Sequence, residues 1–192
     1  MRILLATRNA GKLREARAIL PEVEWISLAD LPPLPPVVED GESFEENARK
    51  KALHCERLTG LPTVGEDSGL CVDALGGRPG VLSARYGGEI RDPERCALLL
   101  EEMKDVPEDH RSASFHSCAV LASSGLVRGV SHGEVAGLIS RAPAGSGGFG
   151  YDPVFLHPRL GRTFAQLSLP EKSALSHRRI ALEGLRPFLV SI

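Results

Sequence analysis

The chain has 192 residues, of which 42% are hydrophobic and 25% are charged, a balance typical of a folded globular protein. This composition excludes a disordered or collagen-like chain, and a formal net charge of −2 excludes a global basic field that would attract nucleic acid. No apolar run approaches the roughly 20 residues that a membrane span requires, and the first residues are too short an apolar stretch for a signal peptide. We therefore expect one cytoplasmic domain over residues 1–192, with neither a membrane nor a nucleic acid as partner.

Several common catalytic and metal-binding motifs are missing from the sequence. The cysteines, at positions 55, 71, 96 and 118, form no C-x-x-C pair, so we expect buried, reduced thiols. The six histidines show neither H-x-x-x-H nor H-E-x-x-H spacing, and no G-x-S-x-G occurs. These absences disfavour a zinc hydrolase and a serine nucleophile.

The first part of the chain predicts a strand, a helix, a long loop and a second helix. Residues 2–7 are an apolar run that ends in a turn at 9–11, and apolar residues then recur at helical spacing up to residue 20. Four prolines followed by acidic residues predict an extended loop over 31–42. Ser43 and Glu46 have the spacing of a capping box, which predicts a helix that ends at Gly60. The side chains expected on its buried face are Phe44, Ala48, Ala52, Cys55 and Leu58.

The rest of the chain predicts further helices and a group of antiparallel strands. Residues 61–77 read as two short strands interrupted by a polar elbow, and a glycine-rich loop follows over 78–88. Asp92 and Pro93 begin a helix with Cys96, Leu99, Leu100 and Met103 inward. Residues 112–122, 126–131 and 133–139 resemble an antiparallel meander, and a loop from 142 leads into a strand near 155. Ser176 opens a last helix through Ile180, Ala181, Leu185, Phe188 and Leu189, which makes the chain a mixed α/β protein.

The first candidate for chemistry is the turn "TRNAGK" at residues 7–12, where a strand end leads into a helix. Exposed amide N–H groups and the positive end of the helix dipole favour a phosphate there, and Lys12 adds a compact charge. An ordinary strand-to-helix turn, with Asn9 as the cap and Lys12 in solvent, is the alternative. The segment is not a Walker A loop, because Leu13 follows Lys12.

The second candidate is a pair of acidic segments, "VVEDGE" at 37–42 and "GEDSGL" at 65–70. Consecutive carboxylates beside an expected core are costly unless a cation or hydrogen-bond donors meet them. Magnesium prefers oxygen ligands, commonly one or two carboxylates together with substrate phosphates, which fits Glu39 and Asp67. A turn in which Asp67 and Ser68 cap backbone amides explains the second segment equally well.

Two further candidates lie near the end of the chain. In "GSGGFGYDPVF", glycines around Phe149 allow close approach to a flat ligand, the ring offers a stacking face, and Asp152 offers acceptors. In "EKSALSHRR", Lys172, His177 and Arg178 place donors near a helix start, which suits a phosphate or a base with keto oxygens. The structural alternatives are a glycine-rich hairpin with core aromatics and a capped, solvated helix terminus.

Together these segments resemble the inosine triphosphate pyrophosphatase family, the noncanonical purine nucleoside triphosphate pyrophosphatases. The resemblance follows the family's order over nearly the whole chain, through "LLATRNAGKLREA", "EDGESFEENARKKA", "EDSGLCVDALGGRPGVLSARYGG", "GGFGYDPVF" and "EKSALSHR". Two departures are mild: Arg8 stands where glycine or asparagine is often found, and Glu66 precedes Asp67 where aspartate is usual.

The resemblance implies Mg²⁺-dependent hydrolysis of ITP, dITP, XTP and dXTP to the monophosphate and pyrophosphate. It implies that Glu39 and Asp67 hold the magnesium, that Asp67 is also the catalytic base, and that Ser68 makes phosphate or sugar contacts. The residues that it assigns to the triphosphate are Thr7, Arg8, Asn9, Ala10, Gly11, Lys12 and Lys51. Those that it assigns to the base pocket are Phe149, Gly150, Tyr151, Asp152, Lys172, His177 and Arg178, with Phe149 stacking on the purine.

The family fold implied is an elongated mixed sheet with flanking helices, in two lobes with the active-site cleft between them, and the protein is expected to be a homodimer. In a pocket of N–H donors, a 6-keto oxygen can accept a hydrogen bond. The 6-amino group of ATP would instead place its own N–H donors against those of the pocket. Two other functions stay open at this point. One is a pyrophosphatase for other modified nucleotides, and the other is a non-catalytic nucleotide sensor or RNA-binding module.

Overall fold

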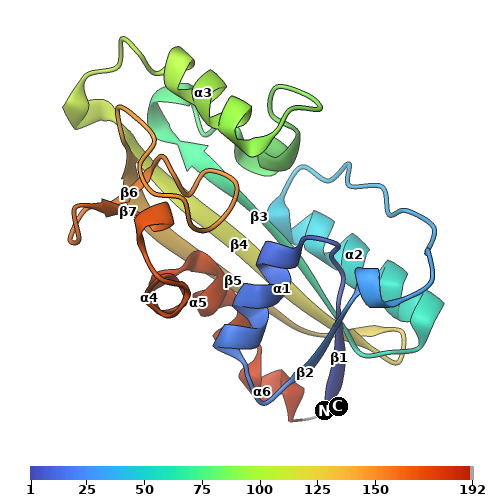
Figure 1. The fold of residues 1–192 in the computed structure, drawn as a ribbon. Coiled ribbons are helices and arrows are strands. Elements are labelled where there is room, and N and C mark those ends of the chain that lie inside the picture. Colours follow the sequence, from blue (N-terminus) through green and yellow to red (C-terminus); the bar gives the residue numbers. More distant parts are fainter. Residues whose placement is uncertain (191–192) are drawn as a thin grey trace.

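The computed structural model, which describes residues 1–190, is built on a seven-stranded mixed sheet (Figure 1). Its strands are β1 Arg2–Leu5, β2 Glu24–Ser27, β3 Thr63–Val72, β4 Ser112–Ser123, β5 Leu126–Ile139, β6 Phe155–His157 and β7 Arg162–Thr163. Their order in the sheet is β2-β1-β3-β4-β5-β6-β7. β1 pairs in parallel with β2 and β3, and the pairs from β3 to β7 are antiparallel. The mixed sheet predicted from the sequence is confirmed.

Helices cover both faces of this sheet. They are α1 Ala10–Ile19, α2 Phe44–Thr59, α3 Asp92–Glu102, α4 Leu169–Leu175, α5 His177–Gly184 and α6 Arg186–Leu189. α1 and α5 pack on one face, whereas α2 packs on the other (Figure 1). Within residues 1–190, no helix combines the length and the apolar character needed to cross a membrane.

The hydrophobic core is divided along the long strands β3, β4 and β5. Near β1, Leu121 packs toward α1 and α5, while its neighbour Val120 packs toward α2, as the twofold alternation of a strand requires. Farther along the same strands, Leu70 and Phe115 join a second cluster with α3 and with residues after β5. The central strands therefore connect two packed regions, and the two-lobe description remains a prediction.

The second helix forms as expected from its end signals. The Ser43 hydroxyl accepts a hydrogen bond from the Glu46 amide at 3.2 Å, and Gly60 ends the helix with a φ of 67°. The other half of the capping box is wrong, because the Glu46 carboxylate accepts from the amide of Glu42 and not of Ser43. Leu58 was expected on the buried face, but it is exposed.

The predicted breaks in β3 and β5 do not occur, and glycines there serve close packing and not turns. A Cβ atom at Gly65 would lie 2.1 Å from the Ala48 carbonyl oxygen of α2, and one at Gly133 would lie 2.0 Å from the His177 carbonyl oxygen of α5. Neither glycine has a positive φ. The segment 61–77, predicted as two strands with a polar elbow, holds one continuous strand, β3, over Thr63–Val72. The two segments 126–131 and 133–139 form one strand, β5.

The last predicted helix is in fact two helices. α5 ends at Gly184 and α6 begins at Arg186, with Pro187 in its first turn, where a missing amide hydrogen is tolerated. Ile180 and Phe188, which were expected inward, are exposed. No element was expected at β2 or α4. All four cysteines are free thiols as expected, but Cys71 is only half-buried.

Candidate active site

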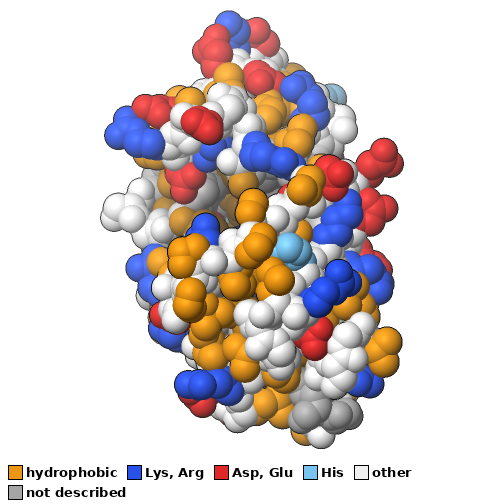
Figure 2. Space-filling model, turned by 90° about the vertical axis from the view of Figure 1, so that its right-hand side faces the viewer, with side chains coloured by type: hydrophobic (Ala, Val, Ile, Leu, Met, Phe, Trp, Pro, Cys, Tyr) orange, Lys and Arg blue, Asp and Glu red, His pale blue; other side chains and the backbone are white. Residues whose placement is uncertain are grey.

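A cavity of about 700 Å³ lies beside the end of β1 and the middle of β3, and residues from distant parts of the chain line it. Viewed from the side of α2, the surface is hollowed between the region of α3 and the rest of the molecule, with hydrophobic side chains beside the hollow (Figure 2). The predicted site residues that line the cavity are Thr7, Arg8, Asn9, Lys12, Glu39, Lys51, Asp67, Ser68, Phe149, Gly150, Tyr151, Asp152, Lys172, His177 and Arg178. Ala10 and Gly11, which were also predicted, do not line it.

The turn before α1 combines the two alternatives drawn from the sequence. The Asn9 side chain accepts hydrogen bonds from the amides of Gly11 at 2.8 Å and Lys12 at 3.2 Å, so two of the amides expected to be exposed are capped. The Lys12 side chain is not solvated, because its Nζ atom lies 2.7 Å from the Glu66 carboxylate and only 17% of the side chain is exposed. Lys12 therefore directs its charge into the cavity.

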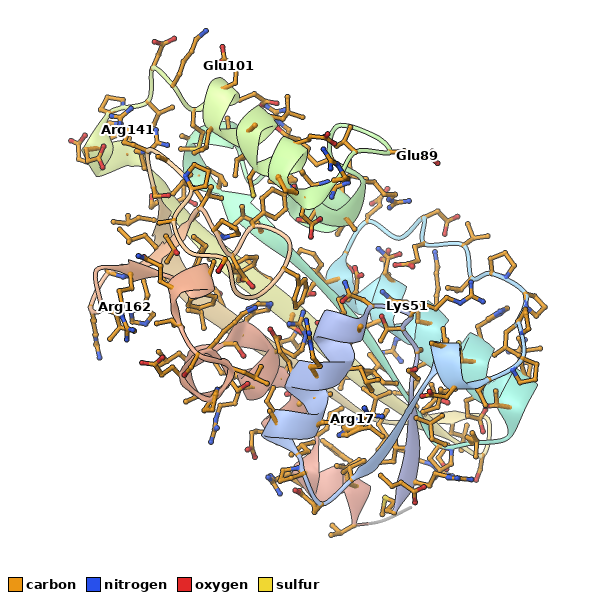
Figure 3. The ribbon with its side chains drawn as sticks, in the orientation of Figure 1. Arg17, Lys51, Glu89, Glu101, Arg141 and Arg162 are labelled. Atoms are coloured by element: carbon orange, nitrogen blue, oxygen red, sulfur yellow. The ribbon has the colours of Figure 1, made fainter. Side chains whose placement is uncertain are left out.

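Two carboxylates that line the cavity share a lysine. Lys51 Nζ lies 2.9 Å from Glu39 Oε2 and 2.7 Å from Asp67 Oδ1, and Figure 3 shows Lys51 reaching from α2 toward the middle of the molecule. Asn47 donates a longer hydrogen bond of 3.4 Å to the other Asp67 oxygen. Burial raises the pKa of Asp67 above its ordinary value, against the lowering effect of Lys51. The alternative of Asp67 as a turn cap is wrong, because Asp67 lies within β3.

Glu66, beside Asp67 on β3, is buried among cationic groups. Its carboxylate faces Lys12 on one side and the Arg178 guanidinium at 3.2 Å on the other, and it accepts a 2.7 Å hydrogen bond from Ser117. Burial alone would raise the pKa of Glu66, but the charges of Arg178 and Lys12 hold it well below the ordinary range. Glu66 is thus a fixed negative charge.

Glu15 of α1 contacts two cations of the last helices that line the cavity, Lys172 and Arg178. One Glu15 oxygen lies 2.6 Å from Lys172 Nζ, and the other contacts Arg178. Lys172 also contacts Asp152, and Arg178 donates to Ser68 at 2.9 Å. Since Lys172 has three N–H donors and Arg178 has five, each keeps a donor beyond these contacts.

The Phe149 ring lies among these charges. Lys172 Nζ is 4.6 Å and the Arg178 guanidinium carbon 5.5 Å from the ring centroid. A Cβ atom at Gly11 would lie 2.5 Å from the ring, so the predicted phosphate turn and the predicted stacking residue meet in space. The Phe149 amide donates to Asp152 at 2.8 Å, which fixes the turn that carries the ring.

His177 lies behind this group as a neutral imidazole. Burial lowers its pKa well below the ordinary value, and the charge of Arg178 lowers it further. Its ring stacks on Phe115 with centroids 4.7 Å apart, and its buried Nδ1 atom has no hydrogen-bond partner among residues 1–190. An uncharged ring nitrogen is therefore available beside the cavity.

Comparisons with known proteins identify the family of the chain. The model of the Ham1 family matches residues 3–188. The chain belongs to the Ham1 family. A dITP/XTP pyrophosphatase of Geobacter sulfurreducens is 49% identical over 98% of this chain and 96% of its own, and one of Shigella flexneri is 47% identical over 96% and 95%. The structure of a HAM1 protein from Coxiella burnetii has a TM-score of 0.87 and 40% identity over the whole of both chains.

Membership of the Ham1 family confirms the resemblance inferred from the five sequence segments, and it confirms the α/β fold. The matched range includes every segment on which that resemblance depended. The cavity described above brings those same segments together, although they are separated by up to about 170 positions in the chain.

Sequence reasoning missed several residues of the site, among them Glu15, Asp92 and Arg95. Glu15 could have been found, because it lies one turn after Gly11 on the buried face of α1, where an unpaired carboxylate would be costly. Asp92 and Arg95 of α3 line the cavity, and nothing in their local sequence indicated this.

Tyr151 was predicted as a ligand residue. Its hydroxyl donates a hydrogen bond to the Ser83 carbonyl at 3.0 Å, so this donor is already used within the protein.

Proposed function

We propose that this protein hydrolyses deaminated purine nucleoside triphosphates, namely ITP, dITP, XTP and dXTP, to the nucleoside monophosphate and pyrophosphate. The observation that carries the proposal is a single cavity lined both by carboxylates with lysines and by an aromatic ring with N–H donors. The names of the curated Ham1 relatives, dITP/XTP pyrophosphatases, support the same reaction. A volume of about 700 Å³ falls within the range of small-ligand sites.

The residues around Thr7 and Lys51 are proposed to hold the triphosphate. Lys12 and Lys51 each place an ammonium group beside the cavity, and each is already balanced by carboxylates. A lysine ammonium is a compact charge that suits phosphate oxygens. We propose that the phosphates take up part of the lysine N–H groups that the carboxylates leave free.

Glu39 and Asp67 fit the magnesium ion that the family implies. Both carboxylates converge on one Lys51 ammonium group, so their oxygens already face a shared cationic position. Hard oxygen donors of this kind are the ligands that Mg²⁺ prefers. When bound, the ion supplies charge neutralisation on the phosphate oxygens.

Asp67 is proposed as the general base. Its Oδ1 atom is held by Lys51 and its Oδ2 atom by Asn47, so the carboxylate has a fixed orientation toward the cavity. A pKa raised by burial makes this carboxylate a better proton acceptor than an exposed aspartate. Asp67 would take the proton of the attacking water.

Selectivity for the base is proposed to rest on groups that can only donate. Lys172 and Arg178 carry N–H groups and no acceptor, so a 6-keto oxygen is matched there and a 6-amino group is not. Neutral His177 can donate or accept according to its tautomer, and it therefore adds shape more than discrimination. The Phe149 ring is proposed to stack on the purine.

Product analysis tests the proposed reaction. Incubation of the protein with ITP and Mg²⁺ is expected to release IMP and pyrophosphate in equal amounts, and excess EDTA is expected to stop the release. Formation of IDP and inorganic phosphate would contradict the pyrophosphatase assignment, and undiminished release in EDTA would contradict the assignment of the metal. The homodimer and the cytoplasmic location stay predictions. Gel filtration with light scattering tests the dimer.

A further inference from the structure

A second cluster of chemically reactive side chains lies under the N-terminal end of α2, away from the nucleotide cavity. It consists of Glu45 in the first turn of α2, Cys118 on β4 and His132 on β5. One oxygen, one sulfur and one nitrogen atom of these side chains all lie within 4.8 Å of one another. None of the three residues lines the larger cavity.

The sheet register places two of these side chains together. Cys118 and His132 are directly opposite in the β4–β5 ladder, so their side chains leave the sheet on the same face. Cys118 packs there with Ala48 and Ala52 of α2, and the start of that helix brings Glu45 over the pair. Glu45 lies far from the other two residues in the sequence, which explains why no metal-binding spacing is visible in it.

We propose that Glu45, Cys118 and His132 form a binding site for a divalent transition metal ion of the Zn²⁺ class. A thiolate, an imidazole and a carboxylate are the three side-chain types that bind zinc, and three protein ligands leave a fourth position for water. Atoms 4.8 Å apart are at most about 2.8 Å from a common centre, so bond lengths of about 2.0–2.3 Å need only small inward shifts.

Each side chain offers one ligand atom. Glu45 uses Oε1 for a 2.7 Å ion pair with Arg49, and its Oε2 is hydrogen-bonded to His132 Nε2 at 3.1 Å. A bound ion would replace this second contact, because it would take Oε2 and Nε2 as ligands. Cys118 is fully buried beside apolar neighbours, and this burial raises the pKa of its thiol to about 12, so the metal-free thiol carries a proton. Binding replaces that proton with the metal and forms the sulfur–metal bond, and the proton passes to solvent.

A smaller cavity lies beside this site, and of the three proposed ligands only His132 lines it. It has a volume of about 330 Å³ and is lined by His132 together with Phe44 and His116. His116 stacks on the Phe44 ring with centroids 6.0 Å apart, so the wall of this cavity is ordered by the same first turn of α2. Because the His132 side chain is 63% exposed, an ion from solvent can reach the nitrogen first.

A bound ion would link the first turn of α2, through Glu45, to strands β4 and β5, through Cys118 and His132. The same helix carries Asn47 and Lys51 toward the nucleotide cavity, so the site would stabilise the helix that presents them. This inference does not rest on the proposed function, because its ligands and its test involve no nucleotide.

Titration of the metal-free protein with Co²⁺ tests the proposal, because a thiolate bound to Co²⁺ gives an intense near-ultraviolet absorption that oxygen ligands alone do not give. We expect this band to saturate at one equivalent of Co²⁺. Added Zn²⁺ is expected to displace the Co²⁺ and so to remove the band. Cys118→Ser is expected to abolish the band, and His132→Asn to weaken Co²⁺ binding at least tenfold. The matched control is His110→Asn, an exposed histidine outside the cluster, which is expected to bind as the wild-type protein does.

No band in the wild-type protein, or a band that persists in Cys118→Ser, would overturn the site. Should Cys118→Ser fail to fold, as judged by its unfolding temperature without metal, the exposed His132→Asn variant decides the question. Unchanged Co²⁺ affinity in His132→Asn would then overturn the proposal, and the expected tenfold loss would support it.

Discussion

Among single residues, Asp67 has the contacts best suited to separating catalysis from folding. Asp67→Asn keeps the size of the side chain and an oxygen for Lys51, but it removes the carboxylate proposed to take a proton from water. We expect turnover of ITP to fall by about 100-fold or more, the range typical for loss of a general base, with little change in unfolding temperature.

Asp40 offers a matched control for this substitution. It is an exposed aspartate that also pairs with a lysine of α2, Lys50, at 2.6 Å. Asp40→Asn is expected to leave kcat and KM near their wild-type values, since exposed ion pairs contribute little. Near wild-type turnover in Asp67→Asn would show that another group accepts the proton.

Asp92 is expected to act on the substrate through the turn that carries Phe149. One Asp92 oxygen accepts from the Gly150 amide at 2.8 Å and the other from Arg95 at 3.0 Å, while the Cys96 thiol donates to the Gly150 carbonyl at 3.3 Å. Asp92 thus positions the turn without touching the reacting atoms. Asp92→Ala is expected to raise KM for ITP about tenfold, the effect of losing roughly 1.4 kcal/mol from a charge-assisted hydrogen bond, with a smaller change in kcat.

Asp92→Asn separates positioning from general destabilisation, because the amide oxygen can still accept from Gly150. Steady-state kinetics are expected to show KM restored to within about threefold of wild type, since most of the hydrogen-bond energy is kept. An Asp92→Ala variant that is less stable but has unchanged KM would refute the positioning role.

At the scale of elements, the contact between β5 and α5 fixes the position of the base-binding helices. A Cβ atom at Gly133 would lie 2.0 Å from a backbone oxygen and 2.7 Å from the Ala181 amide nitrogen. Because both are backbone atoms, the helix itself would have to shift to make room. Gly133→Ala is expected to destabilise the fold by about 1–3 kcal/mol, measured as a fall in the denaturant midpoint. At Gly147 the nearest atom is 3.0 Å away, so Gly147→Ala should cost less. Equal stability of the two variants would contradict this packing argument.

The elements also show where sequence reasoning was sufficient. Helix α2 was predicted well because its cap, its apolar face and its terminal glycine are local signals. β3 was interrupted wrongly because its polar residues resemble a turn, although in the fold they face the cavity and its cations. β5 was interrupted wrongly because the sequence does not distinguish a glycine that admits a neighbouring helix from one that makes a turn. The distinction depends on packing between elements that are distant in sequence.

At the scale of the whole molecule, the site joins buried charges that only the fold could reveal. The family resemblance led to Lys12, Lys172 and Arg178, but Glu15 as the common partner of the last two emerges from the packing of α1 against α4 and α5. Lys12 was given a solvated alternative because a sequence shows no partner for it. Most of the residues named from the sequence line the cavity, whereas their mutual pairing could not be predicted.

Acid is expected to destabilise the whole molecule through buried His177. Its lowered pKa means that the unfolded chain binds a proton below about pH 6.5 while the folded protein does not, so stability present above that pH is lost as pH falls toward the folded pKa. Between the two pKa values, one such group lowers the free energy of unfolding by about 1.4 kcal/mol for each unit by which the pH falls. Denaturant unfolding at pH 7.0 and 5.5 should show a smaller loss in His177→Phe, which keeps a ring against Phe115. An equal loss in both proteins would assign the acid sensitivity to other groups.

The central claim is tested most directly by comparing kcat/KM for ITP, dITP and XTP with the values for ATP and GTP, from pyrophosphate release in the presence of Mg²⁺. Donor-only groups in the proposed base pocket predict that ITP, dITP and XTP exceed ATP by at least about 100-fold, the range seen when a buried polar group is mismatched. GTP also carries a 6-keto oxygen, so its rejection would have to come from contacts with its 2-amino group. Efficient hydrolysis of ATP, or binding of ITP without any hydrolysis, would contradict the account.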